Sequence, residues 1–217
     1  MGSVVGVPRQ GHARRRSSRG IRVAVAAALI GAVTGFSSDF PSARGAPSAR
    51  LGSLAANYAA TVLADGPAAY WRLGESSGTT ATDATGHGFN STYYNGVSLG
   101  ASGAIGGDSN TAASFDGVDD RVNGSVVTTQ VSGVTLEAWV NWDGTAGSSG
   151  EAPMIVYNGH SGQNGYGLMI DVGVGACNGG GQVLIVLLGN VNCRAAYSDA
   201  GLPVGQWTYV VATRSGS

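Results

Sequence analysis

Lysine is absent from this chain of 217 residues, and all twelve of its basic residues are arginines. Charged residues of either sign make up only 12% of the sequence, and they are unevenly divided. Residues 51–217 hold four arginines against twelve acids, a formal charge of −8. Nucleic acids and anionic membranes require clustered positive charge, so this balance excludes both as partners of the main part of the chain.

Cysteine and long apolar runs are also scarce. The chain has two cysteines and no Cys-x-x-Cys pair, which argues against a zinc site. The longest apolar run has about eleven residues, whereas a bilayer-spanning helix needs about 20. Outside that run no segment shows an apolar stripe with the helical period of 3.6. The sequence therefore predicts neither a mostly helical fold nor a helix long enough to span a bilayer.

Glycine and apolar residues are abundant instead. The chain contains 37 glycines and is 43% hydrophobic, which is too apolar for a disordered chain, and the glycines are too irregularly spaced for collagen. Glycines between short apolar runs are typical of tight turns between strands.

The first fifty residues have the pattern of an export signal. A basic region ends at Arg22, an apolar run extends to Val33, and small residues surround Ala46 as at a signal cleavage site. Three consecutive arginines at 14–16 suggest a twin-arginine signal, but the bulky apolar pair that should follow them is missing. We expect residues 1–50 to be an export signal and linker. The alternatives are a disordered basic arm and an uncleaved membrane anchor.

The clearest pattern in the rest of the chain is the alternation in Val134–Trp142, which reads V-T-L-E-A-W-V-N-W. Apolar residues at every second position predict a strand with one buried face. Just before it, Asp116-Gly117 predicts a hairpin turn. Tyr58–Leu63 fits either a helical turn or a strand. Further predicted strands are Ala69–Leu73, Ser91–Tyr94, Ala112–Phe115, Asp120–Val122, Pro153–Tyr157, Gly165–Val172, Gln182–Leu188 and Gln206–Thr213. Many short strands predict an all-β, two-sheet antiparallel sandwich or jelly roll.

Five blocks in order make a more specific resemblance. They are A-D-G-P-A-A-Y-W-R-L-G-E, D-A-T-G-H-G, A-A-S-F-D-G-V-D-D-R-V, V-T-L-E-A-W-V and Q-W-T-Y-V-V-A-T. Together they resemble the LamG-like jelly-roll family of the concanavalin A-like lectin/glucanase superfamily, over residues 58–217. The resemblance implies two packed antiparallel sheets and an accessory module of a secreted bacterial protein. Family members continue past the last block with further strands, so we expect the C-terminal strands to be missing and the module to be part of a larger, multidomain protein.

Two cysteines, Cys177 and Cys193, bracket the predicted strand Gln182–Leu188. In an exported protein this arrangement predicts a disulfide. The alternative is a pair of free thiols.

Aspartates at turns are the candidate metal ligands. Asp116 and Asp119, with Asp120, lie within five residues of one another, and Asp83 lies in a glycine-rich loop. Calcium favours carboxylate and carbonyl oxygens on loops, and the resemblance also implies a structural calcium ion. Asp83, Asp116 and Asp119 are therefore the predicted ligands, and ordinary turn aspartates are the alternative.

Aromatic residues are the candidate ligand contacts, because sugar rings stack on Trp and Tyr. Trp139 shares a predicted strand face with Glu137 and Asn141, and Tyr166 lies on another strand. These four residues are the predicted binding set, and core packing is the alternative for Trp139.

Catalysis is not expected. A glucanase requires paired carboxylates on one strand, but two positions after Glu137 stands Trp139, and no Gly-x-Ser-x-Gly motif is present. We expect a secreted or cell-surface, non-catalytic module that binds carbohydrate or another extracellular surface, with any membrane contact made only through an uncleaved signal. The alternatives are a polysaccharide hydrolase or lyase of the same superfamily and a structural or adhesion domain.

Overall fold

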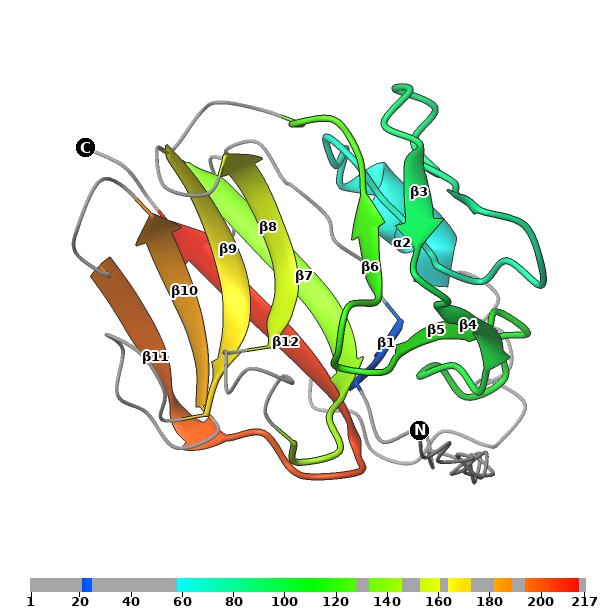
Figure 1. Cartoon of the computed structure of the whole chain (residues 1–217). Helices are drawn as coiled ribbons and strands as arrows, with labels where there is room; N and C mark the ends of the chain where they lie inside the picture. The colour runs from blue at the N-terminus through cyan, green and yellow to red at the C-terminus, as the bar shows by residue number, and fades with distance from the viewer. Residues whose placement is uncertain are drawn as a thin grey trace, which may run out of the picture.

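A computed structural model describes residues 21–24, 58–127, 133–145, 153–160, 164–172, 182–188 and 194–214. These residues form twelve strands and one short helix. The prediction of an all-β protein is confirmed. The strands are arranged in three sheets (Figure 1).

The largest sheet has five strands in the order β12-β7-β1-β5-β4. Its members are β1 (Ile21–Ala24), β4 (Ser98–Ala101), β5 (Ala112–Phe115), β7 (Val134–Asn141) and β12 (Trp207–Arg214). The ladder between β7 and β12 is antiparallel and pairs eight residues of each strand. These two strands are the longest in the sheet, and β12 is one of its edge strands.

Four consecutive strands form the second sheet, in the order β11-β10-β9-β8. They are β8 (Met154–His160), β9 (Asn164–Asp171), β10 (Gln182–Leu188) and β11 (Arg194–Gly201). Because each strand pairs antiparallel with the next one in the chain, the sheet is a meander. Figure 1 shows it in front of β7 and β12.

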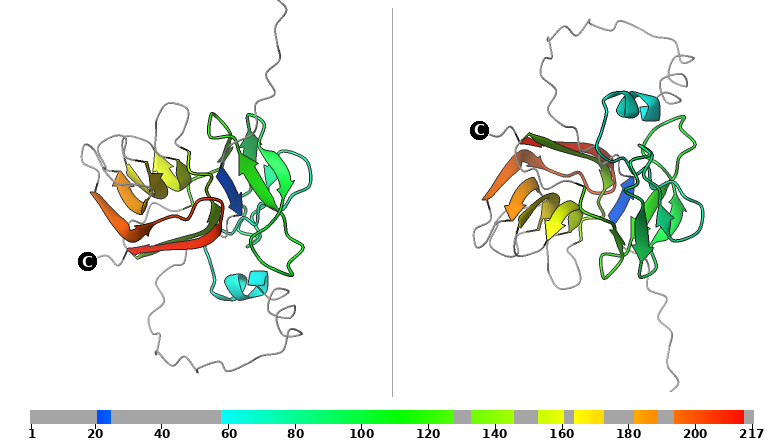
Figure 2. Two further views of the ribbon diagram at one scale, coloured as in Figure 1. Left: turned by 90° about the horizontal axis from the view of Figure 1, so that it is seen from below. Right: turned by 90° about the horizontal axis from the view of Figure 1, so that it is seen from above.

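The third sheet is small and has the order β2-β3-β6. Its strands are β2 (Thr80–Ala81), β3 (Ser91–Tyr94) and β6 (Arg121–Asn123). The segment that follows β6 is tied to β8, because the amide of Val127 donates to Oδ1 of Asn158 at 2.8 Å. Helix α2 (Tyr58–Ala64) buries Val62 against Tyr70. Figure 2 shows that it lies apart from the small sheet, on the side of β7 and β12.

One core unites the three sheets. Its buried side chains come from alternate positions of β7 and β9, from β3, β5 and β12, and from the loops, and include Leu136, Val140, Leu168, Ile170 and Tyr93. The burial of β7 alternates strictly along the strand, as the period of its apolar residues predicts. The outward positions of β7 are therefore available for other roles.

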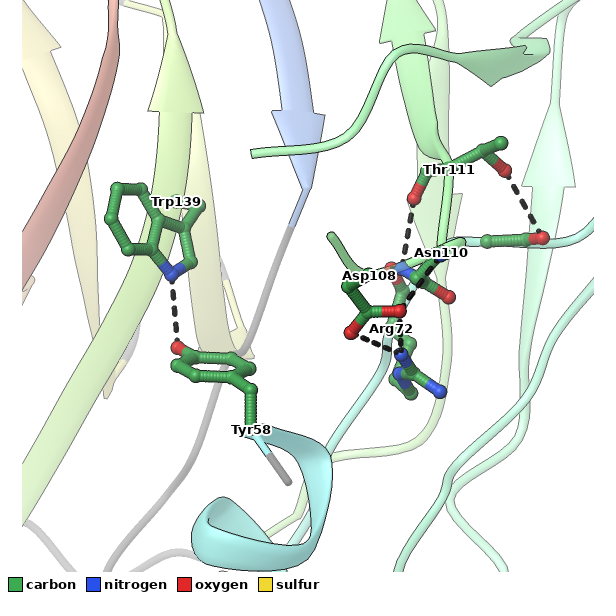
Figure 3. A network of polar contacts seen from close by, with 7 residues as sticks. Tyr58, Arg72, Asp108, Asn110, Thr111 and Trp139 are labelled. Atoms are coloured by element: carbon green, nitrogen blue, oxygen red, sulfur yellow. Dashed lines mark hydrogen bonds and ion pairs between the residues drawn. The ribbon is translucent and has the colours of Figure 1, made fainter. Parts of the chain in front are cut away.

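A polar network fixes the loop before β5. Nη2 of Arg72 lies 3.0 Å from Oδ2 of Asp108, and Nδ2 of Asn110 donates to the carbonyl of Arg72 at 3.1 Å (Figure 3). The Thr111 hydroxyl donates to the Gly74 carbonyl at 3.2 Å. A Cβ at residue 74 would lie 2.0 Å from Oδ1 of Asn110, so any side chain there would push Asn110 out of this network. The network holds the segment between α2 and β2 against the start of β5.

The predicted strands agree with the structure at several positions and differ at others. Ser91–Tyr94, Ala112–Phe115 and Gln182–Leu188 are strands with the predicted ends. Tyr58–Ala64 is helical, which decides between the two alternatives for this segment. The prediction of a strand at Ala69–Leu73 was wrong, since only Trp71 makes an isolated bridge, to Asp83. Strands β2, β4 and β11 were not predicted.

The strand predicted at Gln206–Thr213 is β12, which has β7 as its only ladder partner among the described strands. One other placement in the five-stranded sheet differs from expectation. Ile21–Ala24 belong to the predicted export signal, yet they lie between β5 and β7 as β1 (Figures 1 and 2).

Candidate functional site

The outer face of β7 and β12 carries a row of cross-strand pairs that are not part of the core. On β7 the outward residues are Thr135, Glu137, Trp139 and Asn141, each half-buried. The register places Thr213, Val211, Tyr209 and Trp207, respectively, opposite them. We call these eight residues the outer ladder. It presents aromatic, carboxyl and amide groups on one surface.

An aromatic pair lies at the middle of the outer ladder. The ring centroids of Trp139 and Tyr209 are 5.2 Å apart with an interplanar angle of 40°. This is within the distance range in which aromatic pairs attract each other. Tyr209 remains 40% exposed and its neighbour Val211 51% exposed. The ring of Tyr209 is thus accessible to solvent and packs against the half-buried ring of Trp139.

Polar contacts orient both rings. Nε1 of Trp139 donates to the hydroxyl oxygen of Tyr58 at 2.9 Å, so the first residue of α2 reaches the outer ladder (Figure 3). The hydroxyl of Tyr209 donates to Oε2 of Glu137. The aromatic faces are therefore held in place by groups at their edges.

The electrostatics keep the tyrosines protonated. Burial raises the pKa of Tyr209, and the hydrogen bond to Glu137 and the charge of that carboxylate raise it further. Burial also raises the pKa of Tyr58, and the charge of Glu137 adds to this effect, while the hydrogen bond from Trp139 lowers it. Both hydroxyls are consequently neutral at physiological pH.

The structure brings together three of the four predicted binding residues. Trp139, Glu137 and Asn141 share the outer face of β7. Tyr166 does not join them, because its side chain is 1% exposed and lies in the core, where its hydroxyl accepts a hydrogen bond from Nδ2 of Asn158 at 2.9 Å. Both faces of a sandwich strand carry aromatic residues, so the sequence pattern alone does not separate such a core tyrosine from a surface one.

Sequence reasoning missed Tyr58 and Tyr209 as members of this site. Trp207, Tyr209 and Val211 stand at every second position of the predicted strand, and this spacing indicates that they share one face. The register that sets Tyr209 against Trp139 involves residues far apart in the chain. Tyr58 carries no comparable signal, since its contact depends on where α2 packs.

The predicted metal ligands are divided between two places. Asp116, Asp119 and Asp120 each offer a carboxylate oxygen, and these oxygens lie within 4.8 Å of one another. Oδ1 of Asp120 is buried and has no hydrogen-bond partner, which leaves an oxygen suited to a hard cation. Asp83 is not part of this group of three.

Asp83 instead accepts hydrogen bonds within its own loop. Its Oδ1 accepts from the amides of Tyr70 and Thr85 and from the Thr85 hydroxyl, and its Oδ2 accepts from the amide of Phe89, all at 2.7–3.2 Å. The carboxylate is 5% exposed. Its hydrogen bonds are those of a loop-organising residue. The cysteine pair, Cys177 and Cys193, lies outside the residues that the structure describes.

Within the described ranges there is no helix of the length and apolarity needed to cross a bilayer. No protein-family model, no curated protein and no solved structure matches the chain. The outer ladder and the aspartate group are therefore interpreted from their own chemistry.

Proposed function

We propose that this protein is a secreted, non-catalytic module of LamG-like, jelly-roll type that binds carbohydrate through the outer ladder. The support for the fold is a single core shared by antiparallel sheets that face each other. The support for the function is the exposed ring of Tyr209 beside Trp139 and Glu137.

The Tyr209–Glu137 pair carries the proposal. Sugars present apolar C–H faces that stack on aromatic rings, and hydroxyl edges that need fixed polar partners. Tyr209 offers a ring that is already held by Trp139, so little side-chain entropy is lost on binding. Glu137 provides an acceptor at the edge of that ring, and Asn141 provides an amide on the same face of β7.

An adhesion role is the second candidate, and a different observation favours it. Val211 is about half exposed on the same face, next to Tyr209. Aromatic and aliphatic residues side by side are typical of the centre of a protein interface. A surface of this kind would bind a protein partner without sugar affinity.

Binding of the full chain to an immobilised glycan panel tests the proposal, followed by titration of each hit. The Tyr209→Ala variant removes the exposed ring and is expected to weaken glycan binding about tenfold or more, equivalent to about 1.4 kcal/mol. Tyr94→Ala is the matched control, because Tyr94 is similarly exposed at 42% but lies on β3. The control is expected to bind as the wild type does.

Two results would refute carbohydrate binding through this face. One is a panel without any glycan hit for the folded chain. The other is a glycan hit that Tyr94→Ala weakens as much as Tyr209→Ala does. Hydrolysis of a bound polysaccharide, detected as new reducing ends, would instead favour the alternative of a polysaccharide-active enzyme.

A further inference from the structure

Strand β1 occupies an unusual position in the five-stranded sheet. Val23 is the ladder partner of Ala113 on β5 and of Val140 on β7, and Arg22 is the partner of Ser114 and Asn141. Because β1 is antiparallel to both neighbours, β5 and β7 run parallel to each other. Without β1 they would be separated by about 10 Å, twice the spacing of paired strands, and their facing backbone groups would have no ladder partner.

The residues of β5 and β7 on either side of this gap determine which side chains a strand between them can carry. Ala113 and Val140 are fully buried in the core, whereas Ser114 and Asn141 are only partly buried. A strand in the gap therefore requires an apolar residue opposite Ala113 and Val140. A polar or charged residue is compatible with the adjacent position, opposite Ser114 and Asn141.

The present occupant is short and joined to the rest of the chain by a long connection. β1 has four residues, whereas β7 pairs with β12 over eight. Residues 25–57 separate β1 from α2, and a connection of this length can reach roughly 110 Å when fully extended. The same four residues overlap the apolar run of the predicted export signal. A segment cannot be threaded through an export channel and paired in this sheet at the same time.

We propose that the gap between β5 and β7 is a strand-acceptor site for an extended peptide, which Ile21–Ala24 fill in the whole chain. The peptide runs antiparallel to both strands, with an apolar residue in the place of Val23 and a polar one in the place of Arg22. Main-chain hydrogen bonds to two strands provide affinity, and the alternate side chains provide selectivity. This site adjoins the outer ladder, because β1 pairs with Trp139 and Asn141 of β7, but main-chain binding of a peptide in the gap does not depend on the proposed carbohydrate function.

Exchange of the strand tests the proposal on the full chain. A protease site is introduced at Ala46, the protein is folded and then cut, and a fluorescent peptide with the sequence of residues 20–27 is added. Fluorescence anisotropy is expected to show binding to the cut protein and at least tenfold weaker binding to the uncut protein. A peptide with Val23→Pro is expected to bind at least tenfold more weakly than the parent peptide, because proline lacks the N–H of the ladder.

The matched control peptide carries Arg22→Ser and is expected to bind within twofold of the parent peptide. Failure of the parent peptide to bind the cut protein would overturn the proposal, as would equal binding of the Val23→Pro peptide. A dimer of the uncut chain that dissociates on addition of the peptide would support the site, with the strand then supplied by a second copy.

A cross-link provides a readout that does not depend on cutting. Ladder partners have Cα atoms about 4.5–5.5 Å apart, which suits a disulfide. The Arg22→Cys and Ser114→Cys pair is expected to form a disulfide that peptide mapping identifies, whereas Arg22→Cys with Thr213→Cys is expected to form none. Absence of the first cross-link, or equal yield of the two, would show that β1 does not occupy the gap.

Discussion

At the scale of single residues, Asp83 shows how one buried carboxylate can organise a loop. It links the segment before β2 to the loop before β3 through amides of Tyr70, Thr85 and Phe89. Burial by itself raises the pKa of Asp83, but the hydrogen bonds from Thr85, Tyr70 and Phe89 outweigh it, and the net pKa is lowered. The ionised form is thus the one that stabilises the fold.

Replacing Asp83 with Asn is expected to destabilise the protein by about 2 kcal/mol at pH 7, because an amide NH₂ would then face backbone N–H donors. The stabilisation by Asp83 is fully present above its ordinary pKa of 3.8 and is lost as the pH falls through the lower folded value. Urea unfolding at pH 7 and pH 3 should therefore show a smaller difference between wild type and Asp83→Asn at pH 3.

Asp65→Asn is the control for this measurement, since Asp65 is exposed in the turn after α2. It should leave the unfolding curves at both pH values unchanged. An Asp83→Asn variant as stable as the wild type at pH 7 would contradict the role assigned to this carboxylate.

Replacing Asp120 in the aspartate group is expected to stabilise the protein without metal and to weaken its stabilisation by calcium. Burial raises the pKa of Asp120, and the carboxylates of Asp116 and Asp119 raise it further, against the hydrogen bond from the Asp116 amide. In EDTA, Asp120→Asn should therefore raise the free energy of unfolding, because the amide carries no charge to repel Asp116 and Asp119. If calcium binds here, millimolar calcium should raise the melting temperature of the wild type more than that of Asp120→Asn.

Magnesium at the same concentration is the control for general screening of charge, because Mg²⁺ has the charge of Ca²⁺ but demands a stricter octahedral geometry. Equal melting temperatures of the wild type in EDTA and in calcium, with no calcium found by elemental analysis, would exclude the calcium site.

At the scale of the element, β7 has one face in the core and one in the outer ladder. Leu136 is fully buried, whereas Thr135 lies outward with its Oγ1 3.1 Å from Oγ1 of Thr213. Leu136→Ala is expected to cost about 3 kcal/mol of unfolding free energy, and Thr135→Ala less than about 1 kcal/mol. Denaturant titration measures the unfolding free energy of both variants. Similar losses of unfolding free energy would mean that the faces of β7 are wrongly assigned.

Strand β10 is the element that the predicted disulfide would enclose. It pairs with β9 and β11 along its length, and Cys177 and Cys193 lie before and after it in the sequence. We expect a bond between them in exported protein, with a stabilisation of about 3 kcal/mol. Mass spectrometry of non-reduced secreted protein should show a mass about 2 Da below that of the dithiol. Two thiols that react with an alkylating reagent would contradict the bond.

At the scale of the whole molecule, the exposed side of β12 predicts self-association. β12 has one ladder partner among the described strands, and its Tyr209 and Val211 are exposed. An apolar edge strand pairs readily with other chains, and lysine on such an edge prevents this. Light scattering during size-exclusion chromatography should show concentration-dependent association of the wild type and a monomer for Val211→Lys.

Val126→Lys is the matched control, since Val126 is exposed at 48% but lies outside the strands. It should associate as the wild type does. A wild-type chain that stays monomeric at all concentrations would contradict self-association through β12.

The sequence by itself determined the all-β class and the two faces of β7, because the period of two is a property of the local backbone. It also placed Trp139, Glu137 and Asn141 on one face. It did not reveal β11, whose sequence R-A-A-Y-S-D-A-G lacks alternation and has few strand-forming residues, and which depends on its pairing with β10. Only the tertiary structure decided that Tyr166 is buried, that Tyr209 lies against Trp139, and that Ile21–Ala24 pair with β5 and β7. Those outcomes depend on contacts between residues far apart in the chain, whose free energy no local pattern encodes.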